Sequence, residues 1–413
     1  MRILFCCEFY APSVGGAQEV VRQIAERLAA RGHEVTVATS ALPERRFRDH
    51  NGVRIQEFHV AGNAVWGMEG EVEAYQRFLR SEPRDVVSIY AAQQWTFDAA
   101  WPVLEQAAQR RFFTPCGFSS LYEPAYARYF EVVPEVLRRF DGLVFHATDY
   151  RDARFAREQG LDVSHVIPNG ADEREFGPPA DPAFRTRQGI PEEDFLLLTV
   201  GSLTGVKGHW EVLQAFDRLD LGGRHATLLL VGAAPSDRRR GMLSQVKGIV
   251  KSLAGRSTSD ADPARACRAL ASDIQRRSTN KRVLLADLPR PEVVQAFHAA
   301  DLFVFASHIE YSPIVLYESC AAGTPFLSVP VGNAEEIARW TGGGEICRAA
   351  TDDRGYTHAD PGVLAEAIAS LLREPAKRRS LGDAGRRAWN ERYTWGTVTQ
   401  SYERLFQGEG PVP

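Results

Sequence analysis

The chain has 413 residues, a length that suggests two or three ordinary domains rather than one core. Hydrophobic residues make up 44% of it and charged residues 25%, so its composition excludes disordered, collagen-like and coiled-coil proteins. The formal net charge of −4 gives no overall electrostatic attraction to nucleic acid, and we expect no nucleic-acid partner.

The sequence also lacks the features of membrane-spanning and secreted chains. No apolar run approaches the ~18–20 residues of a membrane-spanning helix, and Met1-Arg2 leads into an apolar strand without a signal-peptide layout. The six cysteines include no C-x-x-C pair and have no ligand-like spacing with histidine, which favours reduced, mostly buried thiols. We therefore expect a cytoplasmic protein.

The first part of the chain alternates strands with helices. An apolar strand over 2–7 leads into a loop with the pair Gly15-Gly16, then a helix that ends at Gly32, then a strand over 34–38. Further strands are expected at 86–90, 111–114, 142–145 and 164–167. Repetition of this βαβ pattern predicts a doubly wound parallel sheet.

A turn-rich, proline-containing segment over 168–191 predicts a connection between domains. The alternation then restarts, with strands expected at 195–200, 226–231, 282–285, 302–306 and 326–329. We expect two Rossmann-like domains, over 1–180 and 190–385, that face each other across a ligand-binding cleft.

Residues 233–281 are longer than a simple connection needs. Five of these residues form an apolar stripe at helical spacing: Met242, Val246, Ile249, Val250 and Leu253. Six others form a basic face: Arg238, Arg239, Arg240, Lys247, Lys251 and Arg256. A core-packed helix with a solvated basic face is the commoner outcome for such a pattern. A helix on an anionic membrane surface is the alternative, and it would place the protein at the inner face of the membrane.

The most informative stretch runs from 301 to 325. After the strand over 302–306 comes a short loop, then Ser312 suits a helix N-cap, Pro313 suits the first helical position, and Gly323 ends the helix. These boundaries place Glu310 in the loop at the carboxyl end of the strand and Glu318 in the second helical turn.

The same boundaries leave the amides of Ile314, Val315 and Leu316 free at the helix N-terminus, which favours an anion or a hydroxyl-rich ligand. Two carboxylates eight residues apart also occur by chance, in capping or solvated roles. Their position at a strand-to-helix switch favours a site.

Another loop, over 201–208, ends in Lys207-Gly208 at the start of a helix. A lysine there suits a phosphate, because the cation and the helix dipole act together. The loop is not a Walker loop, since no G-x-x-x-x-G-K-[ST] is present. A surface lysine in a flexible turn is the alternative interpretation.

Taken together, these motifs resemble the retaining nucleotide-sugar glycosyltransferases of the GT-B fold, in the group called glycosyltransferase family four. The resemblance spans nearly the whole chain, and its most specific element is the E-x7-E pair, Glu310 and Glu318. Its other elements are Gly15-Gly16 with 31–37, Ile167 to Asp172 with Phe176, 200–208, Gly323 to Pro325, 331–337 and 392–395.

The resemblance implies a nucleoside diphosphate sugar as donor, with uridine favoured and guanosine as the alternative, and no cofactor or metal ion. Glu310 and Lys207 would be catalytic, with Glu310 on the transferred hexose, Lys207 on the diphosphate and Glu318 on the ribose. The implied donor-binding residues are Gly15, Gly16, Gly201, Ser202, Lys207, Ser312, Ile314, Val315 and Glu318. Asp260-Ala-Asp262 matches the metal-binding D-x-D of another glycosyltransferase fold but lies away from any expected strand end.

The resemblance also implies an acceptor on the N-terminal domain, either a saccharide or a lipid-linked glycan, as in polysaccharide biosynthesis. Candidate stacking surfaces for its sugar rings are Trp95, Phe118 and Tyr122, with Trp66, Tyr126 and Tyr129 beside them. Since Tyr122, Tyr126, Tyr129 and Val133 fall at helical spacing, a core stripe is the competing interpretation. The last helix, over 390–406, is expected to return to the N-terminal domain.

Three departures from the family pattern keep other functions open. Ser202 stands where members usually carry arginine, Tyr311 where glycine commonly follows the first glutamate, and 114–118 lack the histidine that many members place there. The alternatives are an inactive relative that acts as a binding or scaffold protein, and a nucleotide-sugar 2-epimerase. A dinucleotide-dependent oxidoreductase is less favoured, because the first loop lacks G-x-G-x-x-G.

Overall fold

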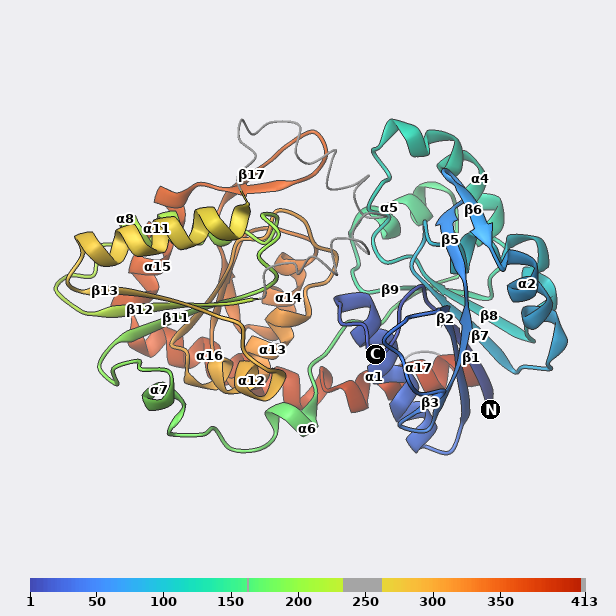
Figure 1. Cartoon of the computed structure of the whole chain (residues 1–413), viewed down its shortest axis with the longest axis horizontal. Coiled ribbons are helices and arrows are strands. Elements are labelled where there is room, and N and C mark those ends of the chain that lie inside the picture. Colours follow the sequence, from blue (N-terminus) through green and yellow to red (C-terminus); the bar gives the residue numbers. More distant parts are fainter. Residues whose placement is uncertain (162, 233–261, 410–413) are drawn as a thin grey trace. The chain divides into compact units, whose positions relative to one another are not determined.

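The computed structural model describes residues 1–161, 163–232 and 262–409 (Figure 1). The chain divides into two compact units, a first unit of Met1–Gly170 with Arg392–Pro413 and a second unit of Ala171–Glu391. The helix expected around 242–253 lies outside the described residues. None of the helices in the described ranges is both long and apolar enough to cross a membrane.

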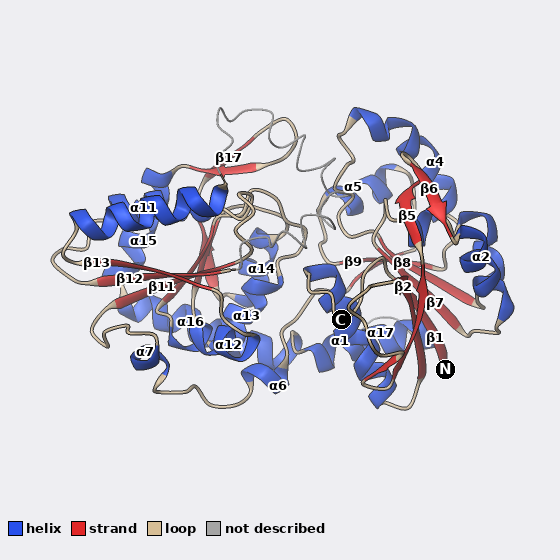
Figure 2. Ribbon diagram, viewed as in Figure 1, coloured by secondary structure: helices blue, strands red, loops and turns tan. Residues whose placement is uncertain are grey.

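The first unit is built on an eight-stranded sheet in the order β10-β9-β8-β7-β1-β2-β4-β3. All neighbours pair in parallel except β3 and β4, which are antiparallel. The strands are β1 (Arg2–Cys6), β2 (Glu34–Ser40), β3 (Asp49–His50), β4 (Val53–Phe58), β7 (Val86–Tyr90), β8 (Arg110–Thr114), β9 (Gly142–Phe145) and β10 (Ser164–Val166). Helices cover both faces of this sheet (Figure 2).

Helices of the first unit follow β1, β6 (Gly67–Gly70), β7, β8 and β9, whereas β2 to β6 follow one another without a helix between them. The helices are α1 (Gly16–Ala30), α2 (Val72–Ser81), α3 (Trp95–Asp98), the 3-10 turns η1 (Trp101–Gln106) and η2 (Pro124–Tyr126), α4 (Ala127–Leu137), α5 (Arg151–Glu158) and α17 (Trp395–Gln407). Sequence patterns did not predict β4 or the hairpin of β5 (Val60–Asn63) and β6 (Gly67–Gly70). The reason for β4 is that only Val53, Ile55 and Phe58 are buried in it, so its apolar residues do not form a continuous run.

Helix α17 packs against α1 in the first unit, although it is the last helix of the chain. The Phe406 ring lies 5.0 Å from the ring of Phe112 and 6.1 Å from that of Phe5. About one helical turn earlier, Glu403 accepts a hydrogen bond from Arg31 at 2.6 Å and pairs with His33 at 2.7 Å. The sheet of the first unit is therefore covered partly by residues from the far end of the chain.

The second unit has a six-stranded, all-parallel sheet in the order β13-β12-β11-β14-β15-β16, the strand order of a Rossmann domain. Its strands are β11 (Phe195–Val200), β12 (Ala226–Val231), β13 (Lys281–Ala286), β14 (Leu302–Phe305), β15 (Phe326–Ser328) and β16 (Gly344–Ile346), with a separate pair β17 (Ala349–Thr351) and β18 (Thr357–Ala359). β12 and β14 are buried along their whole length, as expected for a parallel sheet covered on both faces. The predicted fold class, two Rossmann-like doubly wound domains, is confirmed.

The helices of the second unit are α6 (Glu173–Phe176), α7 (Phe184–Arg187), α8 (His209–Arg218), α11 (Pro263–Arg277), α12 (Arg290–Ala299), α13 (Ile314–Ala322), α14 (Ala334–Thr341), α15 (Pro361–Arg373) and α16 (Pro375–Arg392). Most of them lie on the two faces of the six-stranded sheet, while the short α6 and α7 pack against α12 (Figure 1).

The boundary between the units lies after Gly170, earlier than the expected position near 180. The reason is packing: Phe176 is fully buried against Phe297 and His298, and the Trp389 indole donates to the carbonyl of Ala171 at 3.1 Å. The segment that follows Gly170 is therefore held by the second unit.

Candidate functional site

The candidate site lies at the carboxyl edge of the second unit's sheet. β11 and β14 are neighbours, and β11 pairs with β12 on its other side, so the strand order reverses at this point. Ligands of open α/β sheets bind outside the carboxyl ends of the strands at such a switch point. The loops over 201–208 and 306–313 meet here.

A glycine brings these two loops together. Gly208 has a φ of 71°, and a Cβ on it would overlap the carbonyl oxygen of Ala306, so no other residue fits. The carbonyl of Val206 accepts hydrogen bonds from the His308 amide at 2.9 Å and from the Ser307 hydroxyl at 3.1 Å. The loop after β11 is thus bonded directly to the loop after β14.

This contact places Lys207 against Glu310. The ammonium nitrogen of Lys207 lies 2.6 Å from Oε1 of Glu310, and the Ser307 hydroxyl oxygen lies 3.0 Å from the same oxygen, so its one hydrogen is shared between Glu310 and the Val206 carbonyl. Both charged side chains keep some exposure, 29% for Lys207 and 17% for Glu310. The edge therefore presents a cation and a carboxylate to solvent as a pair.

His209, the first residue of α8, is buried close to Lys207. Burial, together with the charge of Lys207, lowers the pKa of His209 to about 4, so its ring is neutral at pH 7. Neither ring nitrogen has a hydrogen-bond partner within the described residues. A Cβ on Gly201 would lie 3.3 Å from Cγ of Lys207 and 3.5 Å from the His209 ring, so Gly201 leaves room for both side chains.

Helix α13 begins one residue later than predicted. Pro313, not Ser312, occupies the N-cap position, with extended backbone and no side-chain cap, because its φ of −69° and ψ of 110° precede the helical region. The Leu316 amide donates to the Pro313 carbonyl at 3.2 Å, so it is not free as expected. Within the described residues, the amides of Ile314 and Val315 donate no hydrogen bond and remain available to a ligand. Gly323 ends the helix in the left-handed conformation, as predicted.

A third loop supports the backbone of Glu310. Gly332 has a φ of 58°, and a Cβ on it would overlap the carbonyl oxygen of Tyr311. The Asn333 amide also donates to that carbonyl at 2.9 Å. The motif over 331–337 therefore has a structural explanation, because its glycine allows the close approach that holds the Glu310 loop.

Glu318 is buried, with 6% of the residue exposed, and it pairs with Arg290. Arg290 in turn bonds Glu175. Sequence reasoning missed Arg290, Glu175 and His209, because each belongs to an ordinary helix start or short helix without a distinctive motif.

The donor-binding candidates in the first unit are Gly15 and Gly16. Gly15 is the N-cap of α1 and Gly16 its first residue, so their backbone lies at a helix N-terminus, as the predicted donor role needs. A Cβ on Gly16 would meet no other atom, and one on Gly15 would meet only the end of the Gln18 side chain. Packing therefore does not require glycine at either position, and their contact with a donor stays a prediction.

Two of the three aromatic acceptor candidates are wrong. Trp95 and Phe118 are fully buried: the Trp95 indole donates to Ser40, and Phe118 packs edge-on against two phenylalanine rings, so neither offers a face to a sugar. Tyr122 is 54% exposed, with the guanidinium carbon of Arg151 lying 5.1 Å from its ring centroid. Trp66 is 68% exposed, while Tyr126 and Tyr129 are buried, which agrees with the core-stripe interpretation for those two.

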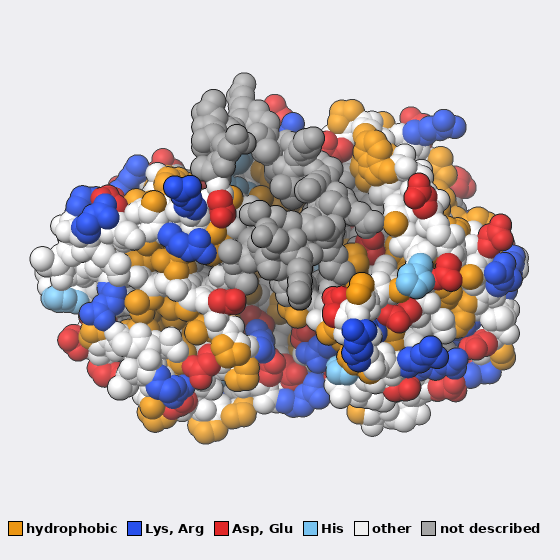
Figure 3. Space-filling view, in the orientation of Figure 1, with side chains coloured by type: hydrophobic (Ala, Val, Ile, Leu, Met, Phe, Trp, Pro, Cys, Tyr) orange, Lys and Arg blue, Asp and Glu red, His pale blue; other side chains and the backbone are white. Residues whose placement is uncertain are grey.

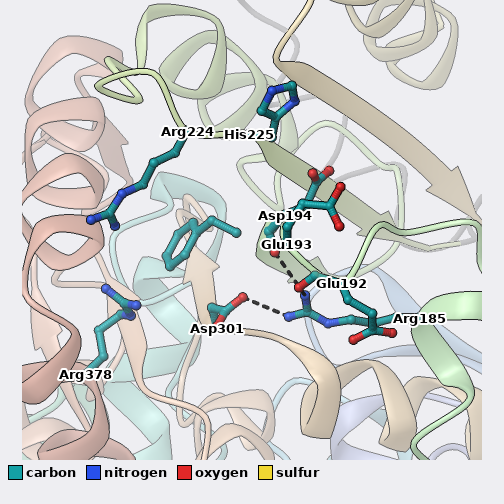
Figure 4. Close-up of a pocket in the computed structure, with 9 residues that line it drawn as sticks. Arg185, Glu192, Glu193, Asp194, Arg224, His225, Asp301 and Arg378 are labelled. Atoms are coloured by element: carbon teal, nitrogen blue, oxygen red, sulfur yellow. Dashed lines mark hydrogen bonds and ion pairs between the residues drawn. The ribbon is translucent and has the colours of Figure 1, made fainter.

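A pocket of about 530 Å³ lies at the opposite, amino edge of the second unit's sheet. Figure 4 shows Arg224 and Arg378 on one side of it and the Arg185–Asp301 ion pair, 2.8 Å long, on the other. Its arginines donate to backbone carbonyls, Arg224 to Leu372 and Arg378 to Leu371 and Leu372. This pocket is built from internal structural bonds and does not coincide with the Lys207–Glu310 edge.

The described residues offer no group of three or more His, Cys, Asp or Glu side chains placed to hold a metal ion. Asp262, from the D-x-D pattern, caps α11 by accepting a hydrogen bond from the Ala264 amide at 3.1 Å. On the face shown in Figure 3, acidic and basic side chains are interspersed over both units.

Two Rossmann-like units, the second with a charged site at its switch point, define a protein of the GT-B class. Residues 15–170 match the model of the glycosyl transferase 4-like domain, and residues 274–388 match that of glycosyl transferases group 1. The chain belongs to the GT-B glycosyltransferases of the family-four type.

Individual relatives are distant. The chain is 28% identical over 242 residues to D-inositol 3-phosphate glycosyltransferase of Xylanimonas cellulosilytica; the match covers 57% of this chain and about half (49%) of that protein. It is 26% identical over 354 residues to the lipopolysaccharide glucosyltransferase WaaG of Escherichia coli, over 82% of this chain and 83% of that one. The crystal structure of Anabaena Alr3699/HepE in complex with UDP has the same fold, with a TM-score of 0.68 and 16% identity over 99% of this chain and 100% of that one.

Proposed function

We propose that the protein is a retaining hexosyltransferase that moves a hexose from a nucleoside diphosphate sugar, with uridine favoured, to a saccharide or lipid-linked acceptor. The observation that carries the proposal is the Lys207–Glu310 pair, 2.6 Å apart, beside the N-terminus of α13. A cation, free helix amides and a carboxylate meet at one sheet edge, which suits a ligand that is both an anion and a sugar.

In this proposal the diphosphate binds to Lys207 and to the amides of Ile314 and Val315. As the bond between the anomeric carbon and the phosphate oxygen breaks, negative charge grows on the leaving diphosphate, and these groups stabilise it without a metal ion. Glu310 binds hydroxyls of the transferred sugar, and Glu318 those of the ribose. Ser202 is exposed and replaces an expected second cation, so Lys207 carries more of the neutralisation.

The proposed step proceeds on one face of the sugar. The acceptor hydroxyl forms the new bond to the anomeric carbon on the side from which the diphosphate leaves, and its proton passes to the departing phosphate oxygen. The configuration at the anomeric carbon is retained, the products are a glycoside and a nucleoside diphosphate, and the protein need not supply a base.

Relatives support the class of substrate. One relative is named a lipopolysaccharide glucosyltransferase and another a D-inositol 3-phosphate glycosyltransferase, and one structural neighbour was crystallised with UDP. A sugar-containing acceptor and a uridine donor are therefore the first choices to test.

The experiment is a binding and turnover screen on the purified chain. Calorimetry with uridine and guanosine diphosphates identifies the base, and release of nucleoside diphosphate from a panel of UDP- and GDP-hexoses identifies the donor, with and without saccharide acceptors. Lys207→Gln is expected to lose most affinity for the diphosphate, and retention is read from the anomeric coupling constant of the product. Absence of binding by both diphosphates, or a product of inverted configuration, would contradict the proposal.

A further inference from the structure

Three charged side chains from three helices meet beside α13. Arg290 is the first residue of α12, Glu175 lies on α6 and Glu318 on α13. Nη2 of Arg290 lies 2.6 Å from Oε2 of Glu175 and 2.6 Å from Oε1 of Glu318, and Nε donates to the same Glu175 oxygen at 3.0 Å. One guanidinium nitrogen therefore bridges two carboxylates.

The three partners differ in burial. The Glu318 side chain is 8% exposed, that of Glu175 27% and that of Arg290 41%. A carboxylate that has lost most of its water needs a cation or hydrogen bonds to stay charged. Arg290 is the cation that pairs with Glu318.

The cation is itself held firmly. Burial acts to lower the pKa of Arg290, but the charges of Glu318 and Glu175 outweigh it and raise that pKa above its usual value. The guanidinium carbon also lies 5.6 Å from the centroid of the Phe176 ring, which is fully buried. Glu175 and Phe176 thus leave Arg290 little freedom to turn away from Glu318.

The pairing occupies only one side of the Glu318 carboxylate. Oε1 faces Arg290, while Oε2 accepts no hydrogen bond within the described part of the chain. A carboxylate has about four lone-pair sites, so an ion pair at Oε1 orients the group and leaves Oε2 available. Without Arg290, the carboxylate would be free to turn and would face the like charge of Glu175.

We infer that Arg290 is a positioning residue, which pairs with the Glu318 carboxylate and orients it so that it can bind the ribose hydroxyls of the nucleoside diphosphate. The inference rests on the proposed function, in which Glu318 binds that ribose. Glu175 acts one step further away, by holding Arg290.

The test measures uridine diphosphate affinity by calorimetry and donor kinetics for Arg290→Gln. The variant should bind the diphosphate about tenfold more weakly, the lower end of what losing a hydrogen bond to a charged group costs. The donor KM should rise by a similar factor while kcat stays within about twofold, since the interaction is made equally in ground and transition states. Arg290→Lys keeps the cation and should restore part of the affinity.

Arg187→Gln is the matched control. Arg187 has a similar exposed fraction, 43%, and also contacts two carboxylates, Asp181 at 2.5 Å and Glu292 at 3.1 Å. It does not contact Glu318, so its replacement should leave diphosphate affinity and KM unchanged. An equal loss in both variants would overturn the inference, because the effect would then follow from any lost surface cation.

Other outcomes separate the inference from the proposed function. Wild-type diphosphate affinity in Arg290→Gln, with normal transfer, would overturn the role of Arg290 and leave the proposed function standing. If Arg290→Gln does not fold, Arg290→Met, which keeps an unbranched apolar chain and removes the cation, takes its place, and wild-type affinity and KM in that variant would overturn the inference as well. If the wild-type chain binds neither uridine nor guanosine diphosphate, both the proposed function and this inference are wrong.

Discussion

The carboxyl edges of the two sheets are built in opposite electrostatic ways. In the second unit, each carboxylate of the E-x7-E pair has a cation, Lys207 for Glu310 and Arg290 for Glu318. In the first unit, Glu8 follows β1 and Asp98 ends α3, and neither carboxylate forms an ion pair within the described residues.

The two carboxyl groups of the first unit, Glu8 and Asp98, have raised pKa values. Burial and the charge of Asp98 raise the pKa of Glu8 to about 7. Burial raises the pKa of Asp98 to about 7 as well, although the Ala64 amide and the Tyr129 hydroxyl, each at 2.8 Å, partly oppose it. The comparison teaches that the carboxyl edges of two similar sheets can differ: one pairs each carboxylate of its motif with a cation, and the other buries two carboxyl groups whose pKa values lie near 7.

The largest expected effect concerns the contact between the loops over 201–208 and 306–313, which brings Lys207 to Glu310. Gly208→Ala should lower the free energy of unfolding by about 3 kcal/mol or more, because the new Cβ overlaps the Ala306 carbonyl oxygen in a backbone conformation that alanine disfavours. Gly222→Ala is the control: its φ of 54° is also positive but its Cβ would meet nothing, so about 1 kcal/mol is expected. Urea unfolding measures both, and equal losses would mean that the close approach at Gly208 is not needed.

Removing the Glu310 carboxylate should reduce turnover roughly a hundredfold while leaving uridine diphosphate affinity nearly unchanged, since its sugar contact matters most near the transition state. Initial rates and calorimetry on Glu310→Gln measure the two effects. Glu345→Gln removes the carboxylate of another lysine–glutamate pair in the same unit, 2.7 Å from Lys377, and should leave both quantities unaltered. A Glu310→Gln enzyme with normal turnover would remove Glu310 from the proposed chemistry.

Glu318→Gln should weaken the free diphosphate and the whole donor alike, by about 1.5–3 kcal/mol. The reason is that the ribose, which both ligands share, loses a charged acceptor. Calorimetric titration beside the Glu310→Gln protein separates the two roles. If both variants lose diphosphate affinity equally, the carboxylates shape the start of α13 rather than divide the donor between them.

Because Glu8 and Asp98 have no cationic partner among the described residues, we expect the stability of the first unit to depend on pH. Both carboxyls have pKa values in the folded state above those of an unfolded chain, so between about pH 4 and 7 the folded state binds more protons and its stability falls as pH rises. Each such proton changes the free energy of unfolding by about 1.4 kcal/mol per pH unit. Asp98→Asn should therefore gain stability relative to the wild type as pH rises from about 4 to 7 in urea titrations. A constant difference across that range would show that Asp98 is ionised throughout.

The smallest expected effect is that of a chelator. If Lys207 and the α13 amides neutralise the leaving diphosphate, transfer should proceed unchanged in EDTA. Complete loss of activity that magnesium or manganese restores would contradict this part of the proposal. Carboxylates other than Glu310 and Glu318 would then be the candidates to bind the metal.

Much of the fold could be predicted from the sequence, because parallel strands buried on both faces have continuous apolar runs. The bounds of β7, β11 and β12 match the expected ranges, whereas β4, whose buried residues are interrupted by polar ones, gave no such run. The positions of Trp95 and Phe118 were misjudged for a related reason, since an aromatic residue in a one-turn helix or a loop carries no periodicity that shows which way it faces.

The candidate site divides in a similar way. Sequence placed Lys207 and Glu310 each after a strand of the same domain, because strand-to-helix switches can be recognised one at a time, and the structure brings the two side chains together. The Arg290–Glu318 pair could not be predicted, since it depends on how α12 packs against α13 and on a short helix, α6, more than a hundred residues earlier. The start of α13 was misplaced by one residue because a serine before a proline suits two registers.

The return of α17 to the first unit has a consequence for biosynthesis. During synthesis, β10 completes the sheet of the first unit, but α17 is made only after the whole second unit. The apolar surface around Phe5 and Phe112 therefore lacks its contact with Phe406 while more than 200 residues are made. Domains generally fold as units during synthesis. The second unit, which is continuous in the chain, can therefore be complete before the first, and a premature stop near residue 394 would leave the sheet of the N-terminal unit uncovered while sparing the C-terminal one.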